Sequence, residues 1–183
     1  MAFDDEAAVV RPWVEGVTFP VLLDREHVLT ERYAISNVPT VVWIDEDGRI
    51  VRPNGVAFGT DLFKEFTGVE ARPHFDAIRR WVKTGAVPIG ADEARSAVGD
   101  LSEDEVLARL HFRIAAHARR TGNEDAARRH FAQAGALAPF DWTVRRAALP
   151  LTGGDPFGEE FFEMYGQWQQ AGSPYHGLPA QRA

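Results

Sequence analysis

Apolar and polar positions alternate in short blocks along the first half of the chain. Residues 40–44, Thr-Val-Val-Trp-Ile, form an uninterrupted apolar and β-branched run, which predicts a strand buried on both faces. An Asp-Gly pair at 47–48 and the run 49–51 after it predict a hairpin turn and a second strand. A shorter run at 19–23 predicts a further strand, and Asp24 is placed to cap the helix that follows.

Helical spacing flanks these strands on both sides. Near the start, apolar residues between Val9 and Val17 recur at helical spacing, and Pro12 predicts a kink or a restart within that helix. A short helix is expected from Asp61. A longer one begins near Pro73 and carries an apolar stripe made of Phe75, Ile78, Trp81 and Val82.

Beyond residue 90 the pattern predicts helices only. Ser102 opens a helix with a capping box, and Asn123 and Asp141 are placed to cap the next two. Aromatic residues spaced along 161–168 predict a final helix, and no periodicity remains from Gly172 onward. The expected organisation is an α/β part at 1–85, a linker at 86–101, a helical region at 102–171 and a flexible tail at 172–183.

Composition removes several classes of function. The chain has 183 residues and no cysteine, which excludes disulfides, cysteine-ligated metals and thiol catalysis within it. A net charge of −7 disfavours duplex nucleic acid and anionic membranes as partners. The sequence lacks a long apolar span, and its first residues have no basic segment typical of a signal peptide. We therefore expect a cytoplasmic protein with no nucleic-acid or membrane partner.

Other candidate chemistry is sparse. The six histidines include no pair at the i, i+4 spacing of a helical metal site, so we interpret them as surface or partly buried residues. The acidic segment 45–47 lacks the ligand spacing of a calcium loop and is interpreted as a solvated turn. We expect no cofactor and no metal.

The stretch from Tyr33 to Val51 resembles a known family. A helix ending in Tyr33-Ala34-Ile35 is followed by Ser-Asn-Val-Pro-Thr at 36–40, a buried strand and an Asp-Gly hairpin. In these residues the chain resembles the thioredoxin-like superfamily, in the redoxin branch that contains the TlpA/ResA thiol oxidoreductases and the AhpC/TSA peroxiredoxins. The resemblance covers roughly residues 3–83, the second half of such a domain. It implies a cis proline at Pro39 and an extended peptide docked beside Val38, Pro39 and Thr40.

The residues support a docking site on their own. A proline that enters a strand cannot donate a ladder hydrogen bond, and the residue before it is held extended. The backbone of Val38 is then available to an incoming strand, the recognition mode called β-augmentation. The alternative is a trans proline that merely starts a strand.

The chain departs from the family at its catalytic element. In the family, a strand and a helix that carries the reactive cysteine precede the helix that here begins near Asp5, and no such element is present. Either the reading frame has been started late, or the protein is a redoxin without its redox half. The missing strands would leave Val41–Ile44 as an unpaired apolar edge. We expect this edge to be covered by another chain, by the protein's own helices, or by the missing part of a longer chain.

The helical region carries a second resemblance. Residues 108–139 resemble a single tetratricopeptide repeat, with departures at His111 and Ala118 where an aromatic is expected. The alternative is a generic helical hairpin. The matching positions are Ile114, Ala115, Gly122, Ala127, Phe131, Ala134 and Pro139.

Three hypotheses follow for function. The first is a redox-inactive thioredoxin-like and tetratricopeptide-like protein that acts through protein–protein contacts. The second is a truncated thiol–disulfide oxidoreductase or peroxiredoxin-like protein whose cysteine element lies upstream of this start. The third is a scaffold that self-associates through the exposed sheet edge.

Overall fold

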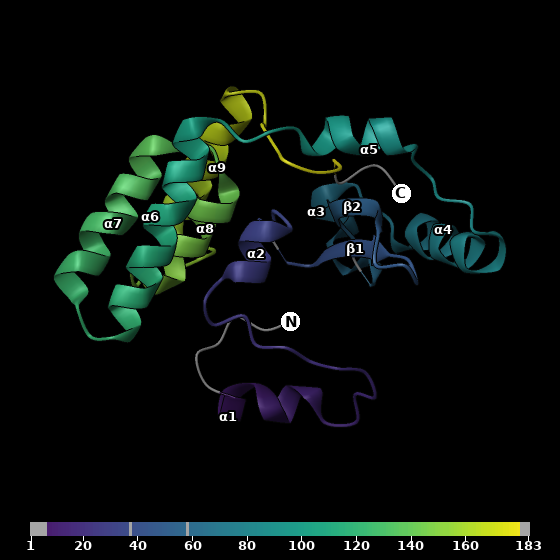
Figure 1. The fold of residues 1–183 in the computed structure, drawn as a ribbon, viewed down its shortest axis with the longest axis horizontal. Coiled ribbons are helices and arrows are strands. Elements are labelled where there is room, and N and C mark those ends of the chain that lie inside the picture. Colours follow the sequence, from purple (N-terminus) through teal and green to yellow (C-terminus); the bar gives the residue numbers. More distant parts are fainter. Residues whose placement is uncertain (1–6, 37, 58, 180–183) are drawn as a thin grey trace.

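A computed structural model describes residues 7–36, 38–57 and 59–179. It shows a mixed α/β protein with a helical region. A small sheet and its helices form one lobe, a group of longer helices forms a second, and an N-terminal arm projects away from both (Figure 1). Among the described residues, no helix has the length and apolar character needed to cross a membrane.

The two strands of the sheet form the expected hairpin. β1 (Thr40–Ile44) pairs antiparallel with β2 (Ile50–Val56), which is longer than the predicted second strand. In the turn, one carboxylate oxygen of Asp45 accepts hydrogen bonds from the backbone N–H groups of Asp47 and Arg49. Gly48 has a φ of 77°, which a residue without Cβ adopts readily. The acidic segment is thus a hairpin turn whose Asp45 is used by the backbone.

The predicted strand at 19–23 does not form. Only Leu23 takes part in a β-bridge, because the described chain supplies no neighbouring strand along this run. Asp24 does serve backbone N–H groups, accepting from Leu29 and from Thr30 at 2.8 Å. The helix it serves, α2 (Val28–Arg32), is shorter than expected.

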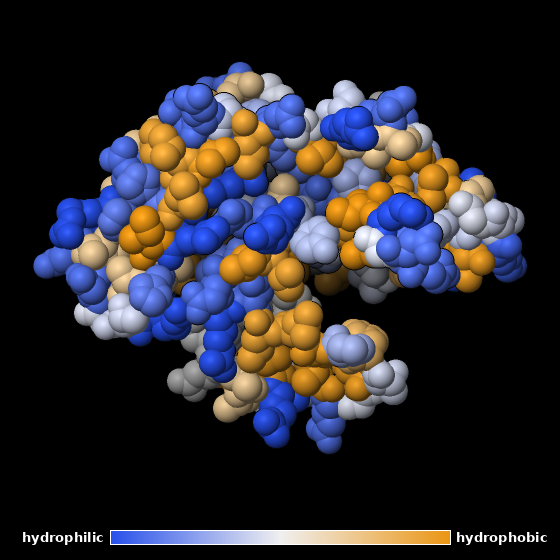
Figure 2. Space-filling view, viewed as in Figure 1, coloured by the Kyte–Doolittle hydropathy of each residue, from blue (hydrophilic) through white to orange (hydrophobic). Residues whose placement is uncertain are grey.

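The N-terminal arm, residues 7–22, contains two short helices. α1 (Ala7–Val10) is followed by the 3₁₀ helix η1 (Arg11–Val14), and Pro12 lies at the start of η1, where the sequence predicted a restart. Five large apolar residues of the arm are exposed, whereas Val10 is buried, and Figure 2 shows apolar surface on the arm. The five exposed residues are Val9, Trp13 (84% exposed), Val17, Phe19 and Leu22.

Helix α4 (Ala71–Thr84) packs against the sheet. The ring of Trp43 from β1 stacks on that of Trp81, with centroids 5.1 Å apart. The predicted stripe on α4 is partly wrong. Its buried residues are Ala71, His74 and Ala77, of which His74 lies beside the Trp43 ring, while Val82 is exposed. Before α4 lie the short helices η2 (Asp61–Phe63) and α3 (Lys64–Thr67).

The segment expected to be a linker, 86–101, contains a helix. α5 (Ala91–Val98) lies between Gly90 and Gly99, and it contacts β2. The sequence did not predict this helix, because Gly85, Pro88 and Gly90 just before it are also typical of a linker.

The helical lobe comprises α6 (Glu103–Arg120), α7 (Glu124–Leu137), α8 (Trp142–Leu151) and α9 (Glu159–Gln170). The predicted caps are confirmed: Ser102 forms a capping box, and Asn123 and Asp141 accept hydrogen bonds from the first turns of α7 and α8. Pro150 lies inside the last turn of α8 rather than after it.

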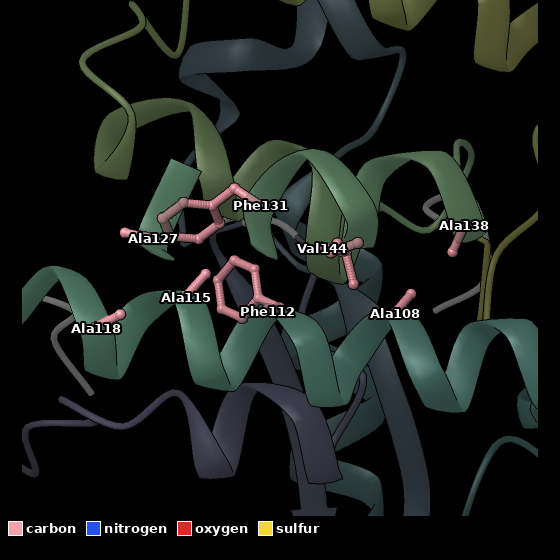
Figure 3. Packing of buried hydrophobic residues seen from close by; sticks show 9 residues of the cluster. Ala108, Phe112, Ala115, Ala118, Ala127, Phe131, Ala138 and Val144 are labelled. Atoms are coloured by element: carbon pink, nitrogen blue, oxygen red, sulfur yellow. The ribbon is translucent and has the colours of Figure 1, made fainter. Parts of the chain in front are cut away.

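The core of this lobe combines small residues with two phenylalanines (Figure 3). The rings of Phe112 and Phe131 meet edge to face, with centroids 5.6 Å apart. Ala115, Ala127 and Ala134, three of the positions that match the repeat, are all buried in the seam between α6 and α7. Ile114, by contrast, lies outside this seam and is half exposed.

Helix α9 covers the other side of α8. Met164 packs with Trp142 and Leu149, and Phe161, Tyr165 and Trp168 lie against them. The predicted aromatic stripe is therefore mostly core, although Phe162 points outward.

Candidate functional site

The predicted site residues lie at the entrance to β1. The Val38–Pro39 peptide bond is cis, as the resemblance to the redoxin branch implied. Val38 is 66% exposed, whereas Pro39 and Thr40 are half-buried. The carbonyl of Pro39 accepts a hydrogen bond from the N–H of Ala57 at 3.4 Å, so the ladder with the second strand begins at the proline.

The hydrogen bonds at the two ends of β1 show which of its backbone groups face β2. The Pro39 carbonyl and the Asp45 N–H both face β2. Groups on an antiparallel strand alternate in direction, so residues 41 and 43 also face β2. The backbone of Val42 and Ile44 therefore points to the opposite edge. Within the described ranges, no third strand pairs with β1 there.

The faces of β1 are less covered than the sequence predicted. Trp43 is buried between Trp81 and the guanidinium of Arg52, which lies 5.5 Å from its ring centroid. Val41 and Val42 are only half-buried and Ile44 is exposed. The prediction of burial on both faces is wrong, because α4 is packed on the Trp43 face and a sheet of two strands presents little surface for a second layer.

The other edge of the sheet is occupied by the C-terminal segment. Residues 173–179, assigned from sequence to a flexible tail, are held against β2. Leu178, 2% exposed, forms a parallel bridge with Gly55, and its N–H donates to the carbonyl of Asn54 at 2.8 Å. The Asn54 side chain donates to the carbonyls of His176 at 2.7 Å and Ala34 at 3.0 Å. Asn54 thus joins three separate stretches of chain.

A second anchor holds the same segment to α5 and to α6 of the helical lobe. His176 Nδ1 lies 2.8 Å from the carbonyl of Val98, and its Nε2 lies 2.9 Å from a carboxylate oxygen of Glu105. The other oxygen of Glu105 accepts from the backbone and hydroxyl of Ser102. Burial opposes ionisation of this carboxyl, but the hydrogen bonds from His176 and Ser102 outweigh it and lower its pKa from 4.5 to about 2.

This lowered pKa predicts a pH dependence. Because the folded-state pKa of Glu105 lies below its unfolded value, ionised Glu105 stabilises the fold above about pH 4.5, and the effect is lost as the pH falls toward 2. We expect wild type to be more stable than Glu105→Gln at pH 6, and this difference to shrink between pH 4.5 and 2. Urea unfolding of both proteins across that range measures it. A difference that stays constant would show that the charge of Glu105 is not involved.

Asn54 lies so close to Gly177 that a side chain at position 177 is expected to destabilise the C-terminal segment. A Cβ at this position would lie 2.7 Å from the Asn54 carbonyl oxygen and would also clash with the Asn54 side-chain amide. We expect Gly177→Ala to cost about 1–3 kcal/mol of unfolding free energy and to release Leu178 from β2. Amide exchange at Leu178 reports the release. The matched control is Gly166→Ala on α9, where nothing lies within 4 Å and exchange at Leu178 should be unchanged.

Polar contacts of three arginines on α6 join α2 and the residues just before it to the helical lobe. Arg109 of α6 donates to Asp141 at 2.9 Å, with side chains 6% and 3% exposed, and its guanidinium also reaches the carbonyl of Glu31 at 3.4 Å. Arg113 pairs with the Glu31 carboxylate at 3.4 Å, and Arg120 pairs with Glu26. The stretch that leads to the site is thereby fixed on α6.

The histidines differ in part from expectation. His27 and His74 are buried rather than on the surface. His111 and His130 bring their Nδ1 atoms within 2.7 Å across the seam between α6 and α7, a contact between two helices that spacing along one helix does not reveal. Over the described ranges, no three histidine, aspartate or glutamate side chains gather as a metal site.

The residues that sequence reasoning missed are Asn54, Glu105 and His176. Only the capping-box role of Glu105 had a local signal. The arrangement as a whole offers an open strand edge beside exposed Val38, an occupied edge on the far side and an apolar arm nearby. In comparisons with known proteins, no family model, no curated protein and no solved structure matches this chain.

Proposed function

We propose that this chain is a redox-inactive, thioredoxin-like and tetratricopeptide-like protein that acts through protein–protein contacts. The observation that carries the proposal is the open edge of β1. The backbone of Val42 and Ile44 faces that edge, and Val38 stands exposed at its start. An extended polypeptide that pairs there would add a strand to the sheet.

The surroundings of this edge favour a polypeptide over a small molecule. Backbone groups on a strand edge bind another backbone without regard to sequence, and the side chains beside them supply the selectivity. Figure 2 shows an open gap between the N-terminal arm and the sheet lobe, with apolar surface on the arm. Trp13 and Phe19 of the arm give a partner large apolar contacts.

The absence of cysteine carries the redox-inactive part of the proposal. With no thiol in the sequence, the chain has no nucleophile for disulfide exchange or for peroxide reduction. In insulin-reduction and peroxide-consumption assays, we expect rates equal to those of buffer. Turnover above that level would refute this part of the proposal.

Binding at the edge can be tested with peptides of defined pattern. The probe is a library of ten-residue peptides that alternate apolar and polar positions. We expect selected peptides to shift the backbone NMR signals of residues 38–44. Val42→Pro removes a donor on the open edge and leaves the groups that face β2. It should weaken the binding of the selected peptides at least about tenfold.

The matched control is Val82→Thr, at an exposed valine of α4 away from the strand. It should bind the selected peptides as wild type does, and the NMR spectrum of each variant reports whether it is folded. Peptides that bind Val42→Pro as tightly as wild type, or that shift other residues, would contradict edge recognition.

The same gap favours a second candidate function. Strands of a larger sheet would fit beside β1, between it and the arm, so the chain would then be part of a thiol oxidoreductase or peroxiredoxin-like protein. The genomic sequence upstream of Met1 discriminates between the candidates. An in-frame strand and helix that carry a cysteine would support this second function, and an upstream stop codon would oppose it.

A further inference from the structure

The outward face of α6 carries an apolar stripe. Figure 1 shows α6 at the front of the helical lobe, and apolar surface follows its line in Figure 2. The stripe consists of four aliphatic residues, each between 44% and 48% exposed: Val106, Leu107, Leu110 and Ile114.

These four residues share one side of the helix. At 3.6 residues per turn, positions 106, 110 and 114 lie one above another, and 107 lies beside them. The buried residues Ala108, Phe112 and Ala115 are on the opposite side, in the core of the lobe. A helix with apolar surface on both sides presents the outer one to a further partner.

Three of the four stripe residues are symmetric in sequence about Leu110, and the counterpart of Leu107 is Arg113. Val106 precedes Leu110 by four residues and Ile114 follows it by four. The same face begins at Glu103 and ends at His117, which lie seven residues before and after Leu110. If a second α6 runs antiparallel across the first, a two-fold axis at Leu110 pairs each of these positions with its counterpart.

The charges of α6 suit the same arrangement. On the outward face its first turn carries Glu103 and its last turn carries His117, whereas Glu105 is bound to His176 and Arg120 to Glu26. In an antiparallel pair, the acidic end of each helix faces the basic end of the other. A parallel pair would place like charges together at both ends.

We propose that the outward face of α6 joins two copies of this chain in an antiparallel homodimer. Leu110 meets Leu110 of the second copy on the axis, Val106 packs against Ile114, and Glu103 faces His117. A two-fold interface requires one surface that is complementary to itself, and the stripe with its charged ends provides one. The dimer does not use the open edge of β1. The test of the dimer is therefore independent of the test of the proposed function.

The test is the mass of the whole chain in solution as a function of concentration. We expect light scattering and sedimentation to show a dimer that dissociates on dilution. Leu110→Glu places two carboxylates together on the axis and should raise the dissociation constant at least about tenfold. Leu62→Glu is the matched control, because Leu62 is an exposed leucine on η2 and should leave the dimer unchanged.

A charge exchange tests the orientation. Glu103→Lys alone and His117→Glu alone should each weaken the dimer, and the two substitutions together should restore it. Circular dichroism confirms that each variant keeps its helices. Because the chain has no cysteine, Leu110→Cys introduces a single thiol, which should form a disulfide-linked dimer on mild oxidation.

Three results would overturn the proposal. The first is a monomer at every concentration up to the solubility limit. The second is a dimer that Leu110→Glu leaves intact. The third is a dimer of the double variant, Glu103→Lys with His117→Glu, that dissociates as readily as the dimers of the two single variants. A dimer that is lost in Val42→Pro and kept in Leu110→Glu would assign self-association to the sheet edge instead.

Discussion

Asp141→Ala is expected to lower the free energy of unfolding by about 3–5 kcal/mol. The substitution leaves the guanidinium of Arg109 buried beside α8 with only the 3.4 Å contact to the Glu31 carbonyl among its described hydrogen bonds. It also removes the cap that accepts from the Thr143 N–H at 2.9 Å. Urea unfolding followed by circular dichroism measures the loss.

Two variants separate the causes. Asp141→Asn keeps an oxygen for the cap but loses the charge, so we expect it to retain most of the destabilisation. Asp125→Ala breaks an exposed pair with Arg128 on α7 and should cost no more than about 1 kcal/mol. A wild-type stability for Asp141→Asn would show that the cap, and not the buried ion pair, accounts for the loss.

Phe112→Ala is expected to cost about 3–5 kcal/mol, because it opens a cavity where three elements meet. The Phe112 ring contacts Phe131 of α7 edge to face and the ring of His27, which precedes α2, at a centroid distance of 5.2 Å. Thermal and urea unfolding report the change. Phe162→Ala, at an exposed position of α9, is the control and should lie within about 1 kcal/mol of wild type. Equal losses for both would contradict the placement of Phe112 in the core.

Features set by local chemistry were predictable from the sequence. Ser102, Asn123 and Asp141 cap their helices because a short polar side chain satisfies N–H groups two or three residues ahead. The hairpin and β1 also formed where expected, because the Asp-Gly pair and the β-branched run at 40–44 are likewise local signals. The position of Val38 and Pro39 before β1, with Thr40 as its first residue, was also anticipated, and the cis bond is the one that the resemblance implied.

Features that depend on distant contacts were not predictable. A strand at 19–23 needs a partner strand, and apolar character alone does not supply one. Leu178 pairs with β2 across more than a hundred residues of chain, and the run around it has no periodicity. The contact between His111 and His130 depends on the register between α6 and α7, which helical spacing within each does not specify.

The candidate site combines both kinds of feature. Its entrance follows from a proline before an apolar strand, which is a local signal. Its open edge follows from the pairing of the whole sheet. β2 is lined on its outer side by the C-terminal segment through Asn54, whereas β1 has no such neighbour in the part of the chain described.

The most direct test of the account is residue-by-residue amide hydrogen exchange along β1 in the free protein. We predict slow exchange at Val41 and Trp43, whose N–H groups face β2, and fast exchange at Val42 and Ile44, whose N–H groups face the open edge. Addition of a selected peptide should slow the second pair only. Equal protection of all four residues in the free protein would show that the edge is already covered and would contradict the proposed site.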